Sequence, residues 1–112
     1  MNLINEESCE FNVSDNLFSF YCGLVIKNIR KEIGFTASDL AKKMNISQQQ
    51  MSRYERGVNK ISIDMLINIA FNLGVSLEKL MKYTFIEIKR SNDAKAFLLK
   101  ERITAVDLIY FN

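Results

Sequence analysis

The sequence predicts an all-α protein, a compact bundle of five helices followed by a short C-terminal extension. Apolar residues recur at spacings of three and four, Ser or Thr precedes most of these segments, and the 112 residues include no proline. This length gives room for a single core. We divide the chain into an acidic leader at residues 1–16, a helical domain at residues 17–83 and an extension at residues 84–112.

A long amphipathic segment precedes Gly34. Its apolar residues recur at intervals of three and four and predict a helix that ends near this glycine. The start of the helix is less well marked, and Ser14 and Asp15 are both candidates for its N-cap. The residues expected to face the core are Leu17, Phe18, Tyr21, Leu24, Val25, Ile29 and Ile33.

A second, short helix follows this glycine. Thr36 and Asp39 resemble a capping box, with Asp in place of the usual Glu, and predict a helix through Met44. Leu40, Ala41 and Met44 are expected to face inward.

A tight turn then leads to a third helix. Asn45 tolerates the left-handed conformation that such a turn requires, and Ile46 is expected to fill its corner. Ser47 is a preferred N-cap, and the helix Gln48–Arg56 is expected to end at Gly57.

Two more capped helices complete the predicted bundle. Ser62 precedes a fourth helix that ends at Gly74, and Ser76 precedes a fifth that runs from Leu77 to about Lys82. The inward residues of the fourth helix are expected to be Met65, Leu66, Ile69, Ala70 and Leu73.

The C-terminal extension is less regular. Residues 84–89 alternate weakly between apolar and polar types, and they fit either a strand or a continuation of the fifth helix. Ser91 or Asn92 is expected to cap a sixth helix that runs towards Arg102. The strongly apolar stretch Ala105–Phe111 is expected to be docked, either on the chain's own core or on a second copy.

Charge is distributed unevenly, although the formal net charge is only +2. Residues 1–26 contain four acidic and no basic residues, whereas residues 27–60 contain eight basic and three acidic residues. A basic central segment beside an acidic N-terminal segment is typical of proteins that bind phosphate groups. Charge alone does not separate this interpretation from a solvated surface of mixed charge.

The third helix has two distinct faces at 100° per residue. Met51 and Tyr54 fall with Ser47 on one side. The other side carries donors and acceptors but no carboxylate: Gln48, Gln49, Ser52, Arg53 and Arg56. Gln pairs bidentately with adenine and Arg with guanine, so this face is suited to reading base edges in the major groove. On composition alone, it fits a merely polar and soluble helix.

The context of this helix favours DNA. Two short helices joined by a tight turn, the second with an open polar face, form a helix-turn-helix in which the second helix enters the major groove. Residues 24–81 resemble the phage-repressor-type domains of the Cro, cI and XRE class, which are lambda-repressor-like bundles of five helices. The resemblance is carried by Ile26, Arg30, Thr36, Leu40, Ala41, Ile46, Ser47, Met51, Ser52, Tyr54, Glu55, Gly57, Leu66, Ala70 and Leu73.

A narrower similarity involves the segment Ser47–Gly57, SQQQMSRYERG. Together with the small size and the short extension, it resembles the MrpJ-like regulators encoded with fimbrial operons. This resemblance implies a regulator of flagellar and fimbrial promoters that helps bacteria switch between adhesion and swimming. Met51 stands where that family often has an aromatic residue, and it is expected to pack inward without altering base reading.

The resemblance also implies roles for individual residues. The expected base-reading residues are Gln48, Gln49, Arg53 and, as a lesser contact, Ser52. Ala37 replaces a glutamine that commonly clamps a phosphate in the family, so Ser38, Lys42 or Lys43 is expected to substitute for it. Gln50 is expected to touch phosphate or the neighbouring helix. Other contacts to the sugar-phosphate backbone are expected from Arg56, Asn59 and Lys60, and from the amides near Thr36 and Ser62.

Arg30 and Glu55 admit two interpretations. In the resembling domains they form a partly buried ion pair that ties the first helix to the third. We favour this pair over a phosphate contact by Arg30.

The sequence argues against an enzyme and against a metal or cofactor site. It contains no histidine, no Gly-rich phosphate loop and no cysteine with a recognisable base. Cys9 and Cys22 lack a CxxC partner, so we expect two reduced, partly buried thiols. No apolar run is long enough to span a bilayer, and we therefore expect a cytoplasmic protein.

Double-stranded DNA and a second copy of the chain are the expected partners. One reading helix covers too few base pairs to select a promoter, so domains of this type usually pair across a two-fold axis. The candidates for this homodimer contact are Phe97–Leu99 and Ala105–Phe111, which fit packing on the chain's own core equally well. The alternative function is a module that binds another protein, such as an antitoxin, in which the third helix would present an apolar outward face.

Overall fold

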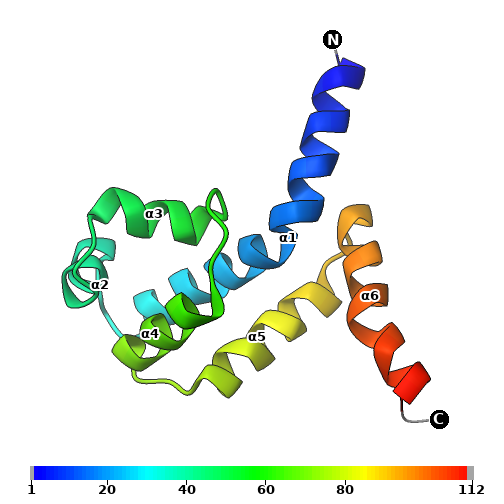
Figure 1. Cartoon of the computed structure of the whole chain (residues 1–112). Helices are drawn as coiled ribbons and strands as arrows, with labels where there is room; N and C mark the ends of the chain where they lie inside the picture. Colours follow the sequence, from blue (N-terminus) through cyan, green and yellow to red (C-terminus); the bar gives the residue numbers. More distant parts are fainter. Residues whose placement is uncertain (1, 111–112) are drawn as a thin grey trace.

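The computed structural model describes the backbone of residues 2–110 and the side chains of residues 16–103. The described chain forms six helices: α1 (Asn2–Glu32), α2 (Ala37–Lys43), α3 (Gln48–Arg56), α4 (Ile63–Leu73), α5 (Leu77–Arg90) and α6 (Ala94–Tyr110) (Figure 1). No strand occurs between residues 2 and 110, which confirms the predicted all-α class. Within the described residues, no helix is both long and apolar enough to cross a bilayer.

Serine caps begin three of the helices, as the sequence predicts. The Oγ atoms of Ser47, Ser62 and Ser76 each accept a hydrogen bond from the backbone amide three residues later, at 3.0 Å. Such a bond satisfies one of the N–H groups that the first turn of a helix leaves without a partner. Gly57 and Gly74 follow the last residues of α3 and α4, also as predicted.

α1 begins much earlier than its first apolar repeat. It starts at Asn2, so Ser14 and Asp15 lie inside the helix, and the prediction that one of them caps it is wrong. Residues 2–22 contain neither glycine nor proline, so no strong helix breaker interrupts them. The acidic leader expected at residues 1–16 is therefore continuous with the first helix from Asn2 onward.

α5 continues through the weakly alternating segment, so the strand alternative for residues 84–89 is wrong. Thr84 and Ile88 are both buried and lie four residues apart, a spacing that places them on one face of a helix. The Thr84 hydroxyl donates to the Leu80 carbonyl at 2.9 Å, which satisfies this buried polar group within the helix itself.

The cap of α6 differs from the prediction. Oδ1 of Asp93 accepts a hydrogen bond from the Lys95 amide at 3.0 Å, immediately before the helix begins at Ala94. The prediction of Ser91 or Asn92 as the cap is wrong, because Ser91 instead ends α5.

The main core lies between α1, α2, α3, α4 and α5. Its most deeply buried side chains include Cys22, Ile26, Leu40, Met51, Leu66, Ile69 and Leu80. Met44, Ile46 and Met65 are half-buried and pack against this core, in agreement with their expected orientation. Ile33 is 44% exposed, so its predicted inward orientation is wrong. It follows the last residue of α1, where the chain leaves the bundle.

A second, smaller cluster joins α6 to α1 and α5. Its buried members are Leu17, Tyr21, Ile88 and Ala96, and Leu99 and Ile103 pack against them. This part of the extension therefore packs on the chain's own core. Phe97 and Leu98, in contrast, are 57% and 55% exposed. The side chains of Ala105–Phe111 lie outside the described residues.

Cys22 is fully buried in the main core, deeper than the partly buried thiol that the sequence suggests. Burial raises the pKa of its thiol from 9.0 to about 11, and a hydrogen bond with Thr84 acts in the opposite direction. The thiol is therefore neutral near pH 7. The side chain of Cys9 lies outside the described residues.

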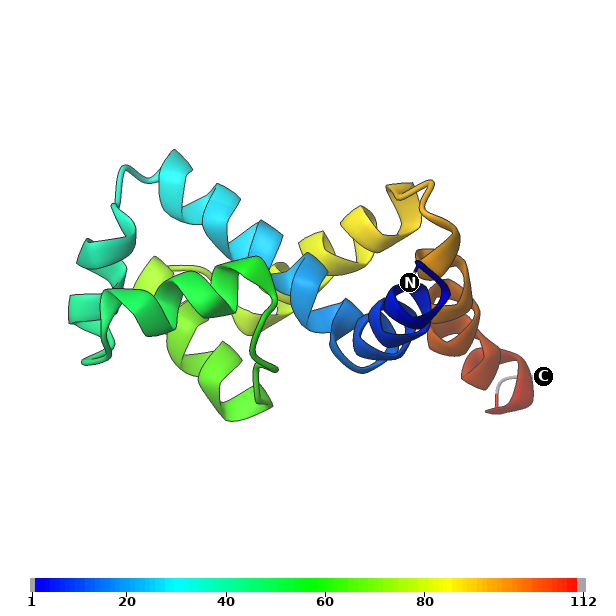
Figure 2. The ribbon, with the colours of Figure 1, turned by 90° about the horizontal axis from the view of Figure 1, so that it is seen from above.

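α3 and α6 lie at opposite ends of the molecule (Figures 1 and 2). α2 lies at the same end as α3, and α1 runs between the two ends in both views. The longest dimension of the molecule is 45 Å. α3 is thus held by the end of the bundle that is remote from the extension.

Gly23 allows α1 to cross the C-terminal part of α3 at close range. A Cβ atom at this position would overlap the carbonyl oxygen of Tyr54 and lie 2.7 Å from that of Glu55. Backbone atoms cannot move aside as a flexible side chain can, so Gly23→Ala is expected to lower the free energy of unfolding by about 1–3 kcal/mol. In a helix without this contact, a change from glycine to alanine would raise the free energy of unfolding by about 0.5–1 kcal/mol. The sign of the measured change therefore shows whether the contact is present.

Chemical denaturation measures this effect. Asn28→Ala, at an exposed site of the same helix, is the matched control and is expected to change stability by less than about 0.5 kcal/mol. A Gly23→Ala protein as stable as the wild type would contradict the close contact between α1 and α3.

Candidate nucleic-acid interface

A tight turn between α2 and α3 sets the direction of α3. Asn45 adopts a left-handed conformation with φ 59°, as the sequence predicts. The amide of Ile46 donates to the Ala41 carbonyl at 3.0 Å, which closes the turn over the end of α2. Ile46 also packs against the main core, so the start of α3 is fixed by both backbone and side-chain contacts.

The rotation of α3 about its axis is fixed by its inner face. Met51 has no exposed surface and Tyr54 is 9% exposed, and both contact the interior of the bundle. Met51 therefore packs inward, as expected. The side chains of Gln48, Gln49, Arg53 and Arg56 are exposed on the outer side of the helix, and Ser52 is half-buried.

The only carboxylate of α3 is turned into the protein. Nε of Arg30 donates to Oε2 of Glu55 at 2.6 Å, and Nη2 of Arg30 donates to Oε1 at 3.0 Å. Nη1 of the same guanidinium donates to the Phe35 carbonyl at 2.8 Å. Both side chains are less than one-tenth exposed. The favoured ion pair is thus present, and it joins α1, α3 and the loop between α1 and α2.

Two polar side chains of α3 have partners within the helix. Nε2 of Gln50 donates to the Tyr54 hydroxyl at 3.2 Å, and Nε of Arg56 donates to the Ser52 hydroxyl at 3.3 Å. Gln50 therefore turns towards its own helix. No hydrogen bond or ion pair between described residues holds the side chains of Gln48, Gln49 or Arg53, which leaves their donors and acceptors free for a ligand.

The start of α2 is closed by its own capping box. The Thr36 hydroxyl accepts from the Asp39 amide at 3.0 Å, and the Thr36 amide donates to Oδ2 of Asp39 at 2.8 Å. The hydrogen bond from the Thr36 amide lowers the pKa of Asp39, so this carboxylate is ionised at neutral pH. The amide of Thr36 is therefore occupied, and Ser38, in the first turn of α2, is half-buried. Nζ of Lys43 lies 5.2 Å from the centroid of the Phe35 ring.

The loop after α3 is attached to α1. The amide of Ile61 donates to the buried Ser19 hydroxyl at 3.2 Å. Gly57 has φ 75°, and a Cβ there would lie 2.6 Å from Cα of Phe20. Lys60 is exposed and Asn59 half-buried in this loop, so both lie on a segment that is anchored at each end.

Residues 26–80 match the family model described as Helix-turn-helix. This segment is similar to helix-turn-helix domains. It spans α2 to α4, with the first turn of α5 and the second part of α1.

Two solved structures of the clp gene regulator ClgR from Corynebacterium glutamicum are similar to this chain. Each superposes with a TM-score of 0.61. One is 21% identical and covers 68% of this chain and 96% of its own, and the other is 19% identical and covers 83% and 94%. At these identities the similarity shows the fold. A comparison with curated proteins finds no match.

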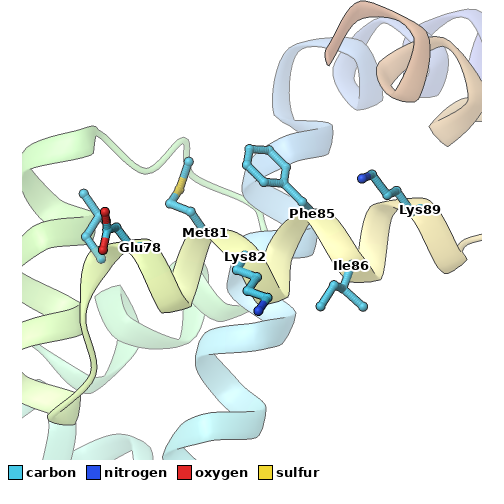
Figure 3. Close-up of a pocket in the computed structure, with 7 residues that line it drawn as sticks. Glu78, Met81, Lys82, Phe85, Ile86 and Lys89 are labelled. Carbon is cyan, nitrogen blue, oxygen red and sulfur yellow. The ribbon is translucent and has the colours of Figure 1, made fainter. Parts of the chain in front are cut away.

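Outside the helix-turn-helix surface, the structure shows a shallow hollow of about 520 Å³ along α5. Met81, Phe85 and Lys89 point to one side of the helix, whereas Lys82 and Ile86 point to the other (Figure 3). The hollow therefore follows a mainly apolar helix surface. Within the described residues no group of three or more Cys, Asp and Glu side chains is placed to hold a metal ion.

Sequence reasoning misses the residues that hold the helix-turn-helix against α1. Gly23 lies against α3, and Ser19 bonds the loop that follows α3, but only Gly23 is marked in the sequence. A glycine inside a helical pattern is a signal of close packing, and Gly23 carries this signal. Ser19 carries no comparable signal, because its partner is 42 residues away in the chain.

Removal of the Glu55 carboxylate is expected to destabilise the domain strongly. Glu55→Ala leaves the buried Arg30 guanidinium with only the Phe35 carbonyl, and breaking a buried pair in this way costs about 3–5 kcal/mol. The melting temperature should fall by roughly 10 °C or more. Glu32→Ala removes an exposed carboxylate and serves as the control. An unchanged melting temperature for Glu55→Ala would refute the role of the pair.

Proposed function

We propose that this protein binds double-stranded DNA sequence-selectively, with α3 as the reading helix, and that it regulates transcription. The observation that carries the proposal is the outer face of α3, which is exposed, polar and free of carboxylates because Glu55 is paired inside. Domains with this arrangement place the second helix of the motif in the major groove. The similar protein from Corynebacterium glutamicum is a clp gene regulator, which fits this proposal.

Base contacts are proposed for Gln48, Gln49 and Arg53. Their side chains are exposed and carry no competing partner among the described residues. Gln matches the N6 and N7 atoms of adenine, and Arg matches the O6 and N7 atoms of guanine. Ser52 is the lesser contact, since its hydroxyl already accepts a hydrogen bond from Arg56.

Contacts to the sugar-phosphate backbone are proposed on both sides of the reading helix. After α3 they come from Arg56, Asn59 and Lys60, and Ser62 offers the amides at the start of α4. Before α3, Lys43 and Ser38 replace the missing glutamine at Ala37, and the amides that follow Thr36 contribute. Gln50 reaches phosphate only if it leaves Tyr54, so its contribution is the smallest.

We further propose that the regulated genes are those of fimbriae and flagella and that the protein acts as a homodimer. The similarity of SQQQMSRYERG to the MrpJ-like regulators supports the first proposal. Genome-wide mapping of bound sites in the source organism tests it. Peaks at fimbrial and flagellar promoters are expected, and a map without them would contradict this choice of genes while leaving DNA binding intact.

Selection of duplexes from a random pool tests base reading without knowledge of the operator. The wild-type protein is expected to enrich one motif. Gln49→Ala combined with Arg53→Ala is expected to lose that motif, because each bidentate pair contributes about 1–3 kcal/mol of discrimination. Weak binding to all sequences should remain, since phosphate contacts persist. Enrichment of the same motif by the double variant would move base reading to another element.

Salt dependence separates DNA binding from a protein-docking function. The logarithm of the affinity for the selected duplex should fall linearly with the logarithm of salt concentration, by about 0.9 for each phosphate contact. Lys60→Ala should reduce this slope by about 1 and leave the selected motif unchanged. Lys82→Ala, at an exposed site of α5, is the control and should leave both unchanged. A flat salt response would favour a protein partner.

A further inference from the structure

The exposed side of α4 carries an apolar stripe, which we define as Ile63, Ile67 and Phe71. Their side chains are 56%, 47% and 80% exposed, and Phe71 is the most exposed large apolar residue among those described. The three residues are spaced by four and so lie along one side of the helix. The opposite side of α4 is buried through Leu66, Ile69, Ala70 and Leu73. Contiguous exposed apolar groups of this kind mark interaction surfaces.

The stripe lies at the reading end of the molecule. α4 follows α3 after a short loop and packs against α1, α2 and α5. Both views place α4 at the same end as α3, whereas α6 lies at the far end (Figures 1 and 2). A partner seated on the stripe would therefore lie beside the reading helix.

The spacing of the stripe is self-complementary. Ile63 and Phe71 lie four residues before and four residues after Ile67. If two α4 helices met antiparallel across a two-fold axis at Ile67, each Ile67 would face its own counterpart, and Ile63 would face Phe71 of the second copy. An isologous contact of this kind needs a surface that matches itself.

Charge also favours a second copy on α4 over one on α5 or α6. A two-fold contact brings each surface close to its own like charges. Asp64 is the only charged residue of α4, whereas exposed lysines on α5 include Lys79, Lys82 and Lys89. The exposed Phe97 and Leu98 of α6 have Lys95 and Arg102 on the same helix.

Half-sites on DNA lie about 34 Å apart, one helical turn. α3 and α6 lie at opposite ends of the molecule (Figures 1 and 2). Copies joined at α6 would carry their reading helices at the outer ends of the pair, whereas copies joined at α4 would carry them near its centre.

We propose that a second copy of this chain docks on the α4 stripe, antiparallel and with the two-fold axis at Ile67. The preference for α4 that comes from the distance between DNA half-sites rests on the proposed DNA-binding function. The exposure, symmetry and charge of the stripe do not depend on that function. The contact replaces Phe97–Leu99 as the principal site of dimerisation. It also sets the distance and orientation between the two reading helices.

Disulfide trapping tests the position of the axis. In a Cys9→Ser background, Ile67→Cys places one thiol on each copy next to the axis, where the effective concentration of the pair is high. Cys22 remains, but it is buried and does not compete. Under mild oxidation without DNA, the Ile67→Cys chain is expected to form a covalent dimer. Leu98→Cys, a matched exposed site on α6, is expected to remain a monomer on a denaturing gel.

Sedimentation provides the second measurement. Ile67→Glu should shift the full-length protein from dimer to monomer with its helical circular dichroism unchanged, whereas Leu98→Glu should sediment as the wild type does. Trapping through Leu98→Cys but not Ile67→Cys, equal trapping at both sites, or a monomeric wild type would each overturn the proposal. Because neither measurement includes DNA, these outcomes are independent of whether the protein binds a duplex.

Discussion

The buried ion pair between Arg30 and Glu55 is the interaction on which the position and the outer surface of α3 depend. One guanidinium bonds both carboxylate oxygens of α3 and a backbone carbonyl beyond the end of α1. The pair has two effects at once. It fixes the position of α3 against α1, and it removes from the outer face the one negative charge that would repel a phosphate backbone. A hydrophobic pair of similar volume could also fix α3 against α1 and leave the outer face of α3 without a carboxylate. It could not donate a hydrogen bond to the Phe35 carbonyl, as Arg30 does.

Close backbone packing between α1 and α3 also holds α3 in place. Gly23 lets the backbone of α1 touch that of α3, Gly57 lets the following loop pass Phe20, and Ser19 bonds the amide of Ile61. α1 thus contacts the C-terminal half of α3 and holds the loop that follows it. Base readout needs side chains held within a narrow range of positions, and a rigid platform provides this without loss of conformational entropy on binding. The side chains of Gln48, Gln49 and Arg53 are exposed and have no hydrogen-bond or ion-pair partner among the described residues.

Local chemistry is sufficient to predict most of the helix-turn-helix. The serine caps, the left-handed Asn45 and the glycine after α3 each act over four residues or fewer, so the sequence alone defines them. The start of α1 and the end of α5 could not be located in this way, because neither is marked by a strong breaker. The last part of α5 also packs through Ile88 against Leu17 and Tyr21 of α1, a contact between residues far apart in the sequence. Contacts such as Ser19 with Ile61 join residues far apart in sequence, and only the fold brings them together. The outward direction of Gln48 and Arg53 follows from helical spacing and is observed, but what these side chains bind is not a property of spacing.

We propose the outer face of α3 as the DNA-binding surface. Backbone amide NMR with a duplex selected by the protein tests this proposal most directly. On addition of the duplex, the largest chemical-shift changes are expected in residues 47–60, with smaller ones at the starts of α2 and α4. Amides of α5 and α6 should change little. Shifts concentrated in α5 and α6, with residues 47–60 unaffected, would contradict the account.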